Sequence, residues 1–329
     1  MTLTGSTPPV PRFDVVAVGE SMLTLYRDPG TAADAFAWDV CGAESNVALY
    51  CAALGLGSAW VSRLDTGMAG SLVLDFVAAG GVDTSLVDLC EDAPTGLMLR
   101  DSPERGQRVS YYRKGSAASL MSRVTVPVDA CLDARAVHLT GITLALSNGC
   151  RDLVLALLSE PAGAVRSFDL NWRPALWPDG PPGELFLEAA NRADVVFVGL
   201  DEAAAVWGFS EPSQVRSALP RPRIVVVKDG AVGVHTFTSD GTHFEPALRG
   251  PIVGPRGAGD AFAAGFLCSF LSHPENLQRC QRLGHVVAMS AMTSELDVAP
   301  LPDASAINAM LAAGPEEWGE LVYPGPGLG

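Results

Sequence analysis

Short, apolar, β-branched segments alternate along the chain with longer segments of helical character. Strands are predicted at 14–19, 59–62, 136–139, 165–169, 195–198 and 224–228, and helices at 47–54, 70–79, 151–158, 184–193, 201–207, 277–292 and 304–312. Strands that are apolar on both faces and alternate with helices are typical of a parallel sheet covered by helices on both sides. The pattern therefore predicts an α/β fold with one mostly parallel sheet, whose ligands bind at the carboxyl ends of the strands.

Further segments have a more alternating pattern. The segments 23–26 and 35–40 lie near the start, and 95–100 and 108–113 are predicted to form an antiparallel hairpin. A second hairpin is predicted at 232–245. We expect the early segments, drawn from about 22–40 and 95–114, to form a small separate sheet that closes over the carboxyl edge of the large sheet as a lid.

The most informative stretch is 252–271. A β-branched start, interpreted as the end of a strand, is followed by Gly257, Ala258, Gly259 and Asp260 and then by a long apolar helix. Small residues leave backbone N–H groups open to an anion, and a helix N-terminus adds more of them. Asp260 could take the proton of a hydroxyl while these amides hold a phosphoryl group, with a pKa that the helix dipole keeps low. Taken alone, the stretch is equally consistent with an aspartate that caps a helix.

Two other stretches place polar side chains where such a fold binds ligands. Tyr111 and Arg113 point the same way from a predicted lid strand, so both could reach the site. Asp169, Asn171 and Arg173 follow a buried strand and alternate onto one face. Two arginines suit a substrate carboxylate better than a neutral sugar, because arginine binds carboxylates with paired hydrogen bonds. For the stretch with Tyr111 and Arg113, the alternative is an ordinary edge strand with a solvated arginine. For the stretch from Asp169 to Arg173, the alternative is the start of an ordinary solvated loop.

Composition excludes several classes of partner. The 329 residues carry 22 basic and 37 acidic side chains, a net charge of −15, which argues against nucleic acid and anionic membrane surfaces. The seven cysteines are scattered, as in a protein of a reducing compartment, and neither a signal peptide nor a membrane span is visible. We therefore expect a cytoplasmic protein that acts on small molecules.

The chain resembles the ribokinase-like (phosphofructokinase-B type) carbohydrate kinases, and most closely their 2-keto-3-deoxygluconate kinase branch. The resemblance rests on VGESM at 18–22, CGAESNVA at 41–48, YYRKGSAAS at 111–119, FDLNWRPALW at 168–177, VVVKDG at 225–230 and GAGDAFAAGF at 257–266. It implies a Rossmann-like fold with a β-sheet lid that can form a homodimer, and transfer of the γ-phosphoryl group of ATP to a hydroxyl of a sugar acid. Mg²⁺ that bridges the ATP phosphates is expected from the chemistry. We expect a single kinase domain at 13–315, with flexible termini at 1–12 and 319–329.

The resemblance implies a role for individual residues. Asp260 resembles the catalytic base, and the amides of Gly257, Ala258 and Gly259 resemble the anion hole for the transferred phosphoryl group. Substrate contacts are implied for Gly42, Asn46, Tyr111, Arg113, Arg173 and Asp297, nucleotide contacts for Lys228, Gly230, Gly257 and Gly259, and an indirect role at the metal for Glu202.

The chain departs from the family pattern at three places. Gly254 and Pro255 stand where the family has an aspartate and a threonine, so a monovalent cation is not carried over. Gly199 replaces the asparagine of the motif that ends in Glu202, and the segment 64–67 replaces a glycine-aspartate pair. Two alternatives therefore stay open. One is a sugar-acid-binding pseudokinase with little turnover, and the other is a kinase for a neutral sugar such as ribose or fructose, or for a related keto acid.

Overall fold

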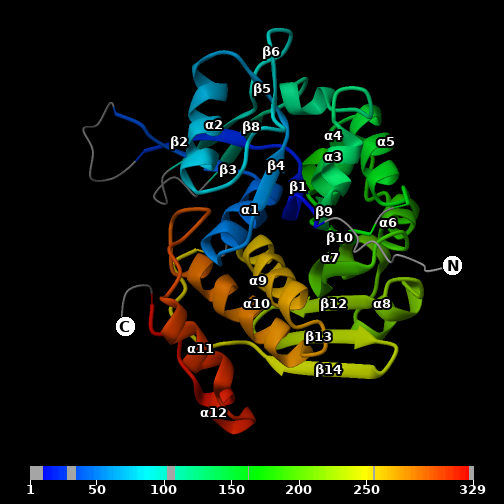
Figure 1. The fold of residues 1–329 in the computed structure, drawn as a ribbon, viewed down its shortest axis with the longest axis vertical. Helices are drawn as coiled ribbons and strands as arrows, with labels where there is room; N and C mark the ends of the chain where they lie inside the picture. Colours follow the sequence, from blue (N-terminus) through cyan, green and yellow to red (C-terminus); the bar gives the residue numbers. More distant parts are fainter. Residues whose placement is uncertain (1–9, 28–34, 102–107, 162, 255, 326–329) are drawn as a thin grey trace, which may run out of the picture.

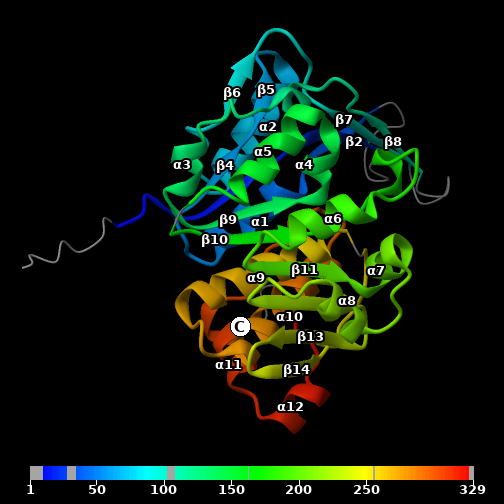
Figure 2. The ribbon, with the colours of Figure 1, turned by 90° about the vertical axis from the view of Figure 1, so that its right-hand side faces the viewer.

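The computed structural model describes residues 10–27, 35–101, 108–161, 163–254 and 256–325. An eight-stranded sheet runs through the centre of this part of the chain, in the strand order β14-β13-β12-β11-β10-β9-β1-β4 (Figures 1 and 2). The bounds are β1 Phe13–Val18, β4 Ser58–Val61, β9 Ala134–Thr140, β10 Val165–Asp169, β11 Val195–Gly199, β12 Ile224–Asp229, β13 Gly233–Thr238 and β14 Gly241–Pro246. The neighbours among β4, β1, β9, β10, β11 and β12 pair in parallel, whereas β13 and β14 add an antiparallel edge.

Helices cover both faces of this sheet, as Figure 1 shows. One face carries α3 Val128–Leu132, α4 Gly141–Leu146, α5 Asn148–Leu157, α6 Gly183–Ala190, α7 Leu200–Trp207 and α8 Pro212–Ala218. The other carries α1 Ala43–Ala53, α9 Ala258–Ser272, α10 Leu277–Met292, α11 Ala304–Ala312 and α12 Pro315–Glu320. Side chains of one strand alternate between the two cores, since Val196 packs on the first side and Phe197 on the second. The α/β fold class predicted from the sequence is confirmed.

A four-stranded sheet in the order β3-β2-β7-β8 lies beside the large one. Its strands are β2 Met22–Tyr26, β3 Ala37–Cys41, β7 Leu97–Arg100 and β8 Val109–Tyr112, with α2 Met68–Ala79 packed against β2. The antiparallel hairpin of β7 and β8 and the parallel pairing of β2 with β7 unite the early segments in one sheet. The predicted lid sheet is therefore present, and it is called the lid below.

Close packing of two helices brings α9 to its place. A Cβ on Gly265 of α9 would lie 2.5 Å from the carbonyl oxygen of Leu283, and one on Gly284 of α10 would lie 2.8 Å from the ring of Phe262. Glycine at both positions lets the two backbones approach more closely than side chains would allow. Helix α9 can therefore be apolar on nearly every side, because the sheet covers one face and α10 another.

Two predicted features differ from the structure. Ile252 and Val253 lie outside any strand and are 67% and 53% exposed, so no strand end precedes Gly257. β-Branched residues make a strand only where a neighbouring strand offers hydrogen bonds, and the amide of Val253 instead donates to the carbonyl of Met292 at the end of α10, at 2.8 Å. In the predicted flexible tail, Tyr323 is instead buried, and its hydroxyl lies 2.6 Å from Ser290 Oγ. The ends of both predicted flexible termini, 1–9 and 326–329, lie outside the described residues.

The structure adds short elements that the sequence pattern did not indicate. They are the two-stranded sheet of β5 Arg63–Asp65 and β6 Asp88–Cys90, the small helices α3, α4, α8 and α12, and the 3₁₀ turns η2 Ala117–Leu120 and η3 Pro174–Leu176. No helix in the described part of the chain is long and apolar enough to cross a membrane.

Candidate active site

The glycine turn before α9 has the geometry of an anion site. Gly257 has a φ of 66°, in the left-handed region that favours glycine, and a Cβ there would lie 2.7 Å from the carbonyl oxygen of Asp297. Ala258 and Gly259 open the 15-residue helix. The first N–H groups of a helix have no partner within it and carry the positive end of the dipole. The turn therefore presents backbone donors at the carboxyl edge of the sheet.

Asp260 lies in the first turn of α9 and is 7% exposed. Asn46 Nδ2 donates to its Oδ2 at 3.0 Å, and Asn171 Nδ2 donates to its Oδ1 at 2.9 Å. Its carboxylate is held by side chains of two other segments and makes no cap bond to α9. Asp260 is therefore oriented as a side chain of a site, which the helix-cap interpretation does not account for.

The pKa of Asp260 was expected to be low, and this expectation is wrong. Burial raises the pKa of Asp260 to about 6, against the opposing effects of the Arg173 charge and the Asn46 hydrogen bond. Loss of hydration disfavours the charged form more than the helix end and the nearby cations favour it. A carboxyl group with this pKa is ionised at neutral pH and is a better base than an exposed aspartate.

Asn171 is a site residue to which the sequence assigned no specific role. It follows β10, is buried, and has a φ of 40°, the only positive φ of a non-glycine residue among those described. Asparagine tolerates this conformation better than most residues. The signal was already visible in the sequence as a polar side chain at the carboxyl end of a buried strand, but its partner Asp260 lies 89 positions further on.

Lys228 places a positive charge beside the glycine turn. It lies on β12, and its Nζ is 2.9 Å from Asp169 Oδ2 and 3.3 Å from the point that a Cβ on Gly259 would occupy. Burial lowers the pKa of Lys228, but the charges of Asp169 and Glu202 outweigh that effect and raise it. The ammonium group therefore stays charged at neutral pH, next to the free amides of α9.

Glu202 joins two loops of the site. Its Oε2 accepts from the amide of Gly199 at 2.8 Å, and its Oε1 accepts from the amide of Trp172 at 2.9 Å. Burial raises the pKa of Glu202. The glutamate thus ties the segment after β10, which carries Asn171, to the start of α7.

Other predicted nucleotide and cation positions lie near the same edge. Gly230, in the turn after β12, has a φ of 49° and open space where a Cβ would be. Gly254 precedes the glycine turn, and its amide donates to the carbonyl of Met292 at 3.2 Å. Pro255 lies outside the described residues.

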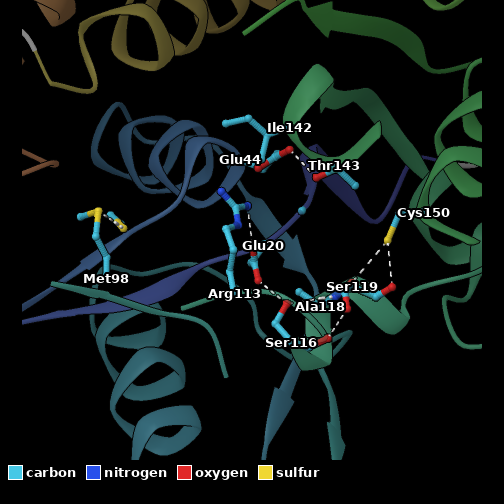
Figure 3. A network of polar contacts seen from close by, with 12 residues as sticks. Glu20, Glu44, Met98, Arg113, Ser116, Ala118, Ser119, Ile142, Thr143 and Cys150 are labelled. Carbon is cyan, nitrogen blue, oxygen red and sulfur yellow. Dashed lines mark hydrogen bonds and ion pairs between the residues drawn. The ribbon is translucent and has the colours of Figure 1, made fainter. Parts of the chain in front are cut away.

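The predicted substrate contacts lie in several settings. Gly42 is the N-cap of α1, one turn before Asn46. Arg113 follows β8 and is only 12% exposed, because it forms an ion pair with Glu20 (Figure 3). Tyr111 is 47% exposed on the lid.

Asp297 and Arg173 are two further predicted substrate contacts that lie near the glycine turn and Asp260. Asp297 is 6% exposed and its carbonyl contacts Gly257. Burial, together with the charge of Asp39, raises the pKa of Asp297 to about 6. Arg173 is exposed, and its charge is the largest influence that lowers the pKa of Asp260, so the guanidinium lies near that carboxylate.

These groups provide what a phosphoryl transfer to a hydroxyl requires. Asp260 is a buried carboxyl group that is ionised at neutral pH, residues 257–259 begin a helix whose first amides have no partner within it, and Lys228 and Arg173 carry positive charge nearby. Positioning and charge stabilisation of this kind supply most of the rate in such transfers.

Comparison with known proteins gives the same answer. The model of the pfkB family carbohydrate kinases matches residues 12–304. The chain is 32% identical over 314 residues to 2-dehydro-3-deoxygluconokinase of Bacillus subtilis (strain 168), covering 92% of this chain and 96% of that one. It is 33% identical over 285 residues to the enzyme of that name from Thermoproteus tenax, covering 82% and 85%.

Solved structures have the same fold. Fructokinase with bound ATP from Xylella fastidiosa superimposes with a TM-score of 0.80 and 25% identity, covering 90% of this chain and 97% of that one. The family model spans nearly the whole described fold, including both sheets and the glycine turn. The chain therefore belongs to the pfkB family of carbohydrate kinases and is a phosphotransferase.

Proposed function

We propose that this kinase transfers the γ-phosphoryl group of ATP to a hydroxyl of a sugar acid, 2-keto-3-deoxygluconate. The observation that carries the proposal is the nearly buried guanidinium of Arg113, whose partner Glu20 packs with its backbone against Gly42, the N-cap of α1. A carboxylate accepts paired, charge-assisted hydrogen bonds from a guanidinium, whereas the hydroxyls of a neutral sugar accept only weaker ones. Two relatives are named 2-dehydro-3-deoxygluconokinase, and 2-dehydro-3-deoxygluconate is another name for 2-keto-3-deoxygluconate. Both names support the same substrate.

In the proposed reaction, the acceptor hydroxyl lies against Asp260. The hydroxyl oxygen attacks the γ-phosphorus, and the hydroxyl proton passes to the Asp260 carboxylate. ADP leaves with the electrons of the broken P–O bond. The amides of Gly257, Ala258 and Gly259 bind the oxygens of the transferred group, and Lys228 offsets the negative charge on the nucleotide side.

The remaining site residues bind the two substrates. Gly42 lets the sugar approach the N-terminus of α1, and Asn46 orients both the sugar and Asp260. Asp297 accepts from a sugar hydroxyl, Arg173 contacts the substrate and the phosphate, and Gly230 leaves room for the nucleotide.

Mg²⁺ fits the site as an ion that the nucleotide carries. Among the described residues, no group of three or more His, Cys, Asp or Glu side chains is arranged to hold a metal ion. Mg²⁺ commonly keeps several waters and binds mainly through substrate phosphates, so few protein ligands are needed. Both oxygens of Glu202 already accept from backbone amides, and we propose that it acts on the metal only through water.

A substrate panel tests the function. ADP release is measured with ATP, Mg²⁺ and each of 2-keto-3-deoxygluconate, its galactonate isomer, fructose and ribose. We expect turnover with the sugar acids, and loss of most of it in Arg113→Ala. Preference for fructose or ribose would contradict the sugar-acid assignment. No ADP from any substrate, with a sugar acid still raising the melting temperature, would indicate a pseudokinase.

We further propose that the lid forms a homodimer. All four side chains of the edge strand β8 are exposed, with Tyr112 at 61%, and at the opposite edge of the lid Phe36 and Trp38 add large apolar surface at 57% and 45% exposure. An unpaired edge with apolar side chains is a ready surface for a second copy. Sedimentation equilibrium of the wild type and of Tyr112→Glu tests this, and a wild-type monomer at tens of micromolar would refute it.

A further inference from the structure

Glu20 is a buried carboxylate with no part in the mechanism above. It lies between β1 and β2, where the chain passes from the large sheet into the lid, and its side chain is 0% exposed. Two residues of the segment that returns from the lid, Arg113 and Ser116, bind it (Figure 3). One carboxylate therefore joins the outgoing and the returning connection between the two sheets.

The carboxylate is fixed from several sides. Its Oε2 pairs with Arg113 Nη2, and its Oε1 accepts from Ser116 Oγ. Gly96 lies against it, since a Cβ there would be 3.0 Å from Oε1. Ser116 is itself anchored, because it caps the buried turn η2 by accepting from the amide of Ser119. Glu20 thus has little freedom to move.

The Glu20 segment also packs against the substrate side of the site. Its carbonyl oxygen is 2.6 Å from the point that a Cβ on Gly42 would occupy, and Ser21 Oγ donates to Ser45 Oγ at 2.6 Å. Both contacts lie in the first turn of α1, where Asn46 holds Asp260. The Glu20–Arg113 pair therefore sits beside the residues that would bind the sugar.

Two roles for Glu20 can be distinguished by electrostatics. In the first, a substrate carboxylate displaces Glu20 from Arg113, which would leave a fully buried carboxylate without its cation. That state is strongly unfavourable. In the second, Arg113 stays on Glu20, which holds the guanidinium in one orientation, and the substrate binds to the part of the arginine side chain that remains exposed, 12% of its surface. The second role agrees with the geometry.

We infer that Glu20 is a positioning residue that orients Arg113 for the substrate carboxylate and so sets the preference for sugar acids over neutral sugars. The inference rests on the proposed function, because it requires Arg113 to recognise a carboxylate. Glu20 acts through the Arg113 guanidinium, so it should not affect the KM of substrates that lack a carboxylate.

A double-mutant cycle tests this inference. Glu20→Gln, Arg113→Gln and the double variant are assayed with 2-keto-3-deoxygluconate and with its C1 amide, a neutral analogue of nearly the same shape. We expect Glu20→Gln to raise KM for the acid about tenfold or more, as loss of a charged hydrogen bond would. KM for the amide and kcat for both should change by no more than about twofold. In the Arg113→Gln background, Glu20→Gln should no longer affect KM for the acid.

Three results would overturn the inference. Equal losses on acid and amide would make Glu20 merely structural. A lower KM for the acid in Glu20→Gln would mean that Glu20 competes with the substrate. An undiminished effect in the Arg113→Gln background would mean that it does not act through Arg113.

Two further variants keep the test decisive. Glu20→Asp keeps the charge but places the carboxylate farther from Arg113, because its side chain is one methylene shorter. It replaces Glu20→Gln if that protein does not fold, and the same rise in KM for the acid alone is expected. Glu245→Gln breaks a matched buried pair with Arg282, at 2.6 Å and far along the sheet, and should lower the melting temperature without altering the acid-to-amide ratio. If Arg113→Gln itself affects acid and amide equally, the proposed carboxylate recognition fails together with this inference. If only Glu20→Gln does so, the inference alone fails.

Discussion

The hydrogen bond from Asn171 to Asp260 should extend to lower pH the range in which the enzyme is active. Asp260 acts as a base only when ionised, so kcat/KM should fall as the pH drops through its pKa of about 6. Asn171 donates to Oδ1 at 2.9 Å and so favours the carboxylate over the acid. Removing this donor should raise the pKa of Asp260 and move the acid limb of the profile to higher pH.

The replacement Asn171→Gly isolates this effect. Asn171 has a φ of 40°, which glycine adopts without cost, so the backbone should keep its course. A hydrogen bond to a charged group contributes about 1.5 to 3 kcal/mol, and one pH unit corresponds to about 1.4 kcal/mol. The acid limb should therefore move up by roughly one pH unit or more, which takes it close to neutral pH.

The assay is ADP release with the sugar acid at saturating ATP, followed from pH 5 to 9 at constant ionic strength. Asn191→Ala is the matched control, because Asn191 bonds to carbonyl groups at the end of α6, away from the site, and should leave the profile unchanged. An acid limb that stays in place in folded Asn171→Gly, or moves to lower pH, would refute the reasoning.

Four other predictions, from three variants, concern activity and stability. Asp260→Asn should lower kcat by about 10²- to 10⁴-fold, the usual contribution of a general base, and unchanged turnover would sink the assignment. The same variant should melt at a higher temperature at pH 8. The pKa of Asp260 is about 6 when folded against 3.8 for the free group, so its charge costs stability above pH 6 and nothing below about pH 4. At about 1.4 kcal/mol for each pH unit between the two values, the gain is at most about 3 kcal/mol, and its absence at pH 8 in melting experiments would contradict the burial argument. Gly265→Ala should destabilise the protein by about 1 to 3 kcal/mol in urea unfolding, because the added Cβ meets the carbonyl of Leu283, and wild-type stability would show that α9 and α10 are free to separate. Gly257→Ala should lower kcat, because the added Cβ strains the turn that presents the amides. Expressed as a free energy, the loss in kcat should be at least as large as the loss in stability, and a kcat equal to that of the wild type would argue against the anion hole.

The sequence alone determined the architecture of this protein. The alternation of apolar strands and helices is a local pattern, set by residues that are close in the chain. This pattern located all six parallel strands, the antiparallel edge and the lid strands. The glycine turn and Asp260 were recognisable for the same reason, because four consecutive residues carry the proposed donors and the proposed base. The interpretation of 252–253 as a strand end failed because a strand also requires a partner, which no local pattern reveals.

Only the tertiary structure decided the electrostatics of the site. Asn46 and Asn171 lie 214 and 89 positions from Asp260, yet both bind its carboxylate, and their segments bury it enough to raise its pKa to about 6. The pairing of Arg113 with Glu20, across 93 positions of chain, likewise turned an apparently free arginine into a neutralised and oriented one. Burial and charge act through space, and a pKa depends on every group within a few ångströms. The sequence therefore indicated the candidate site residues, and the fold set how they ionise and where they point.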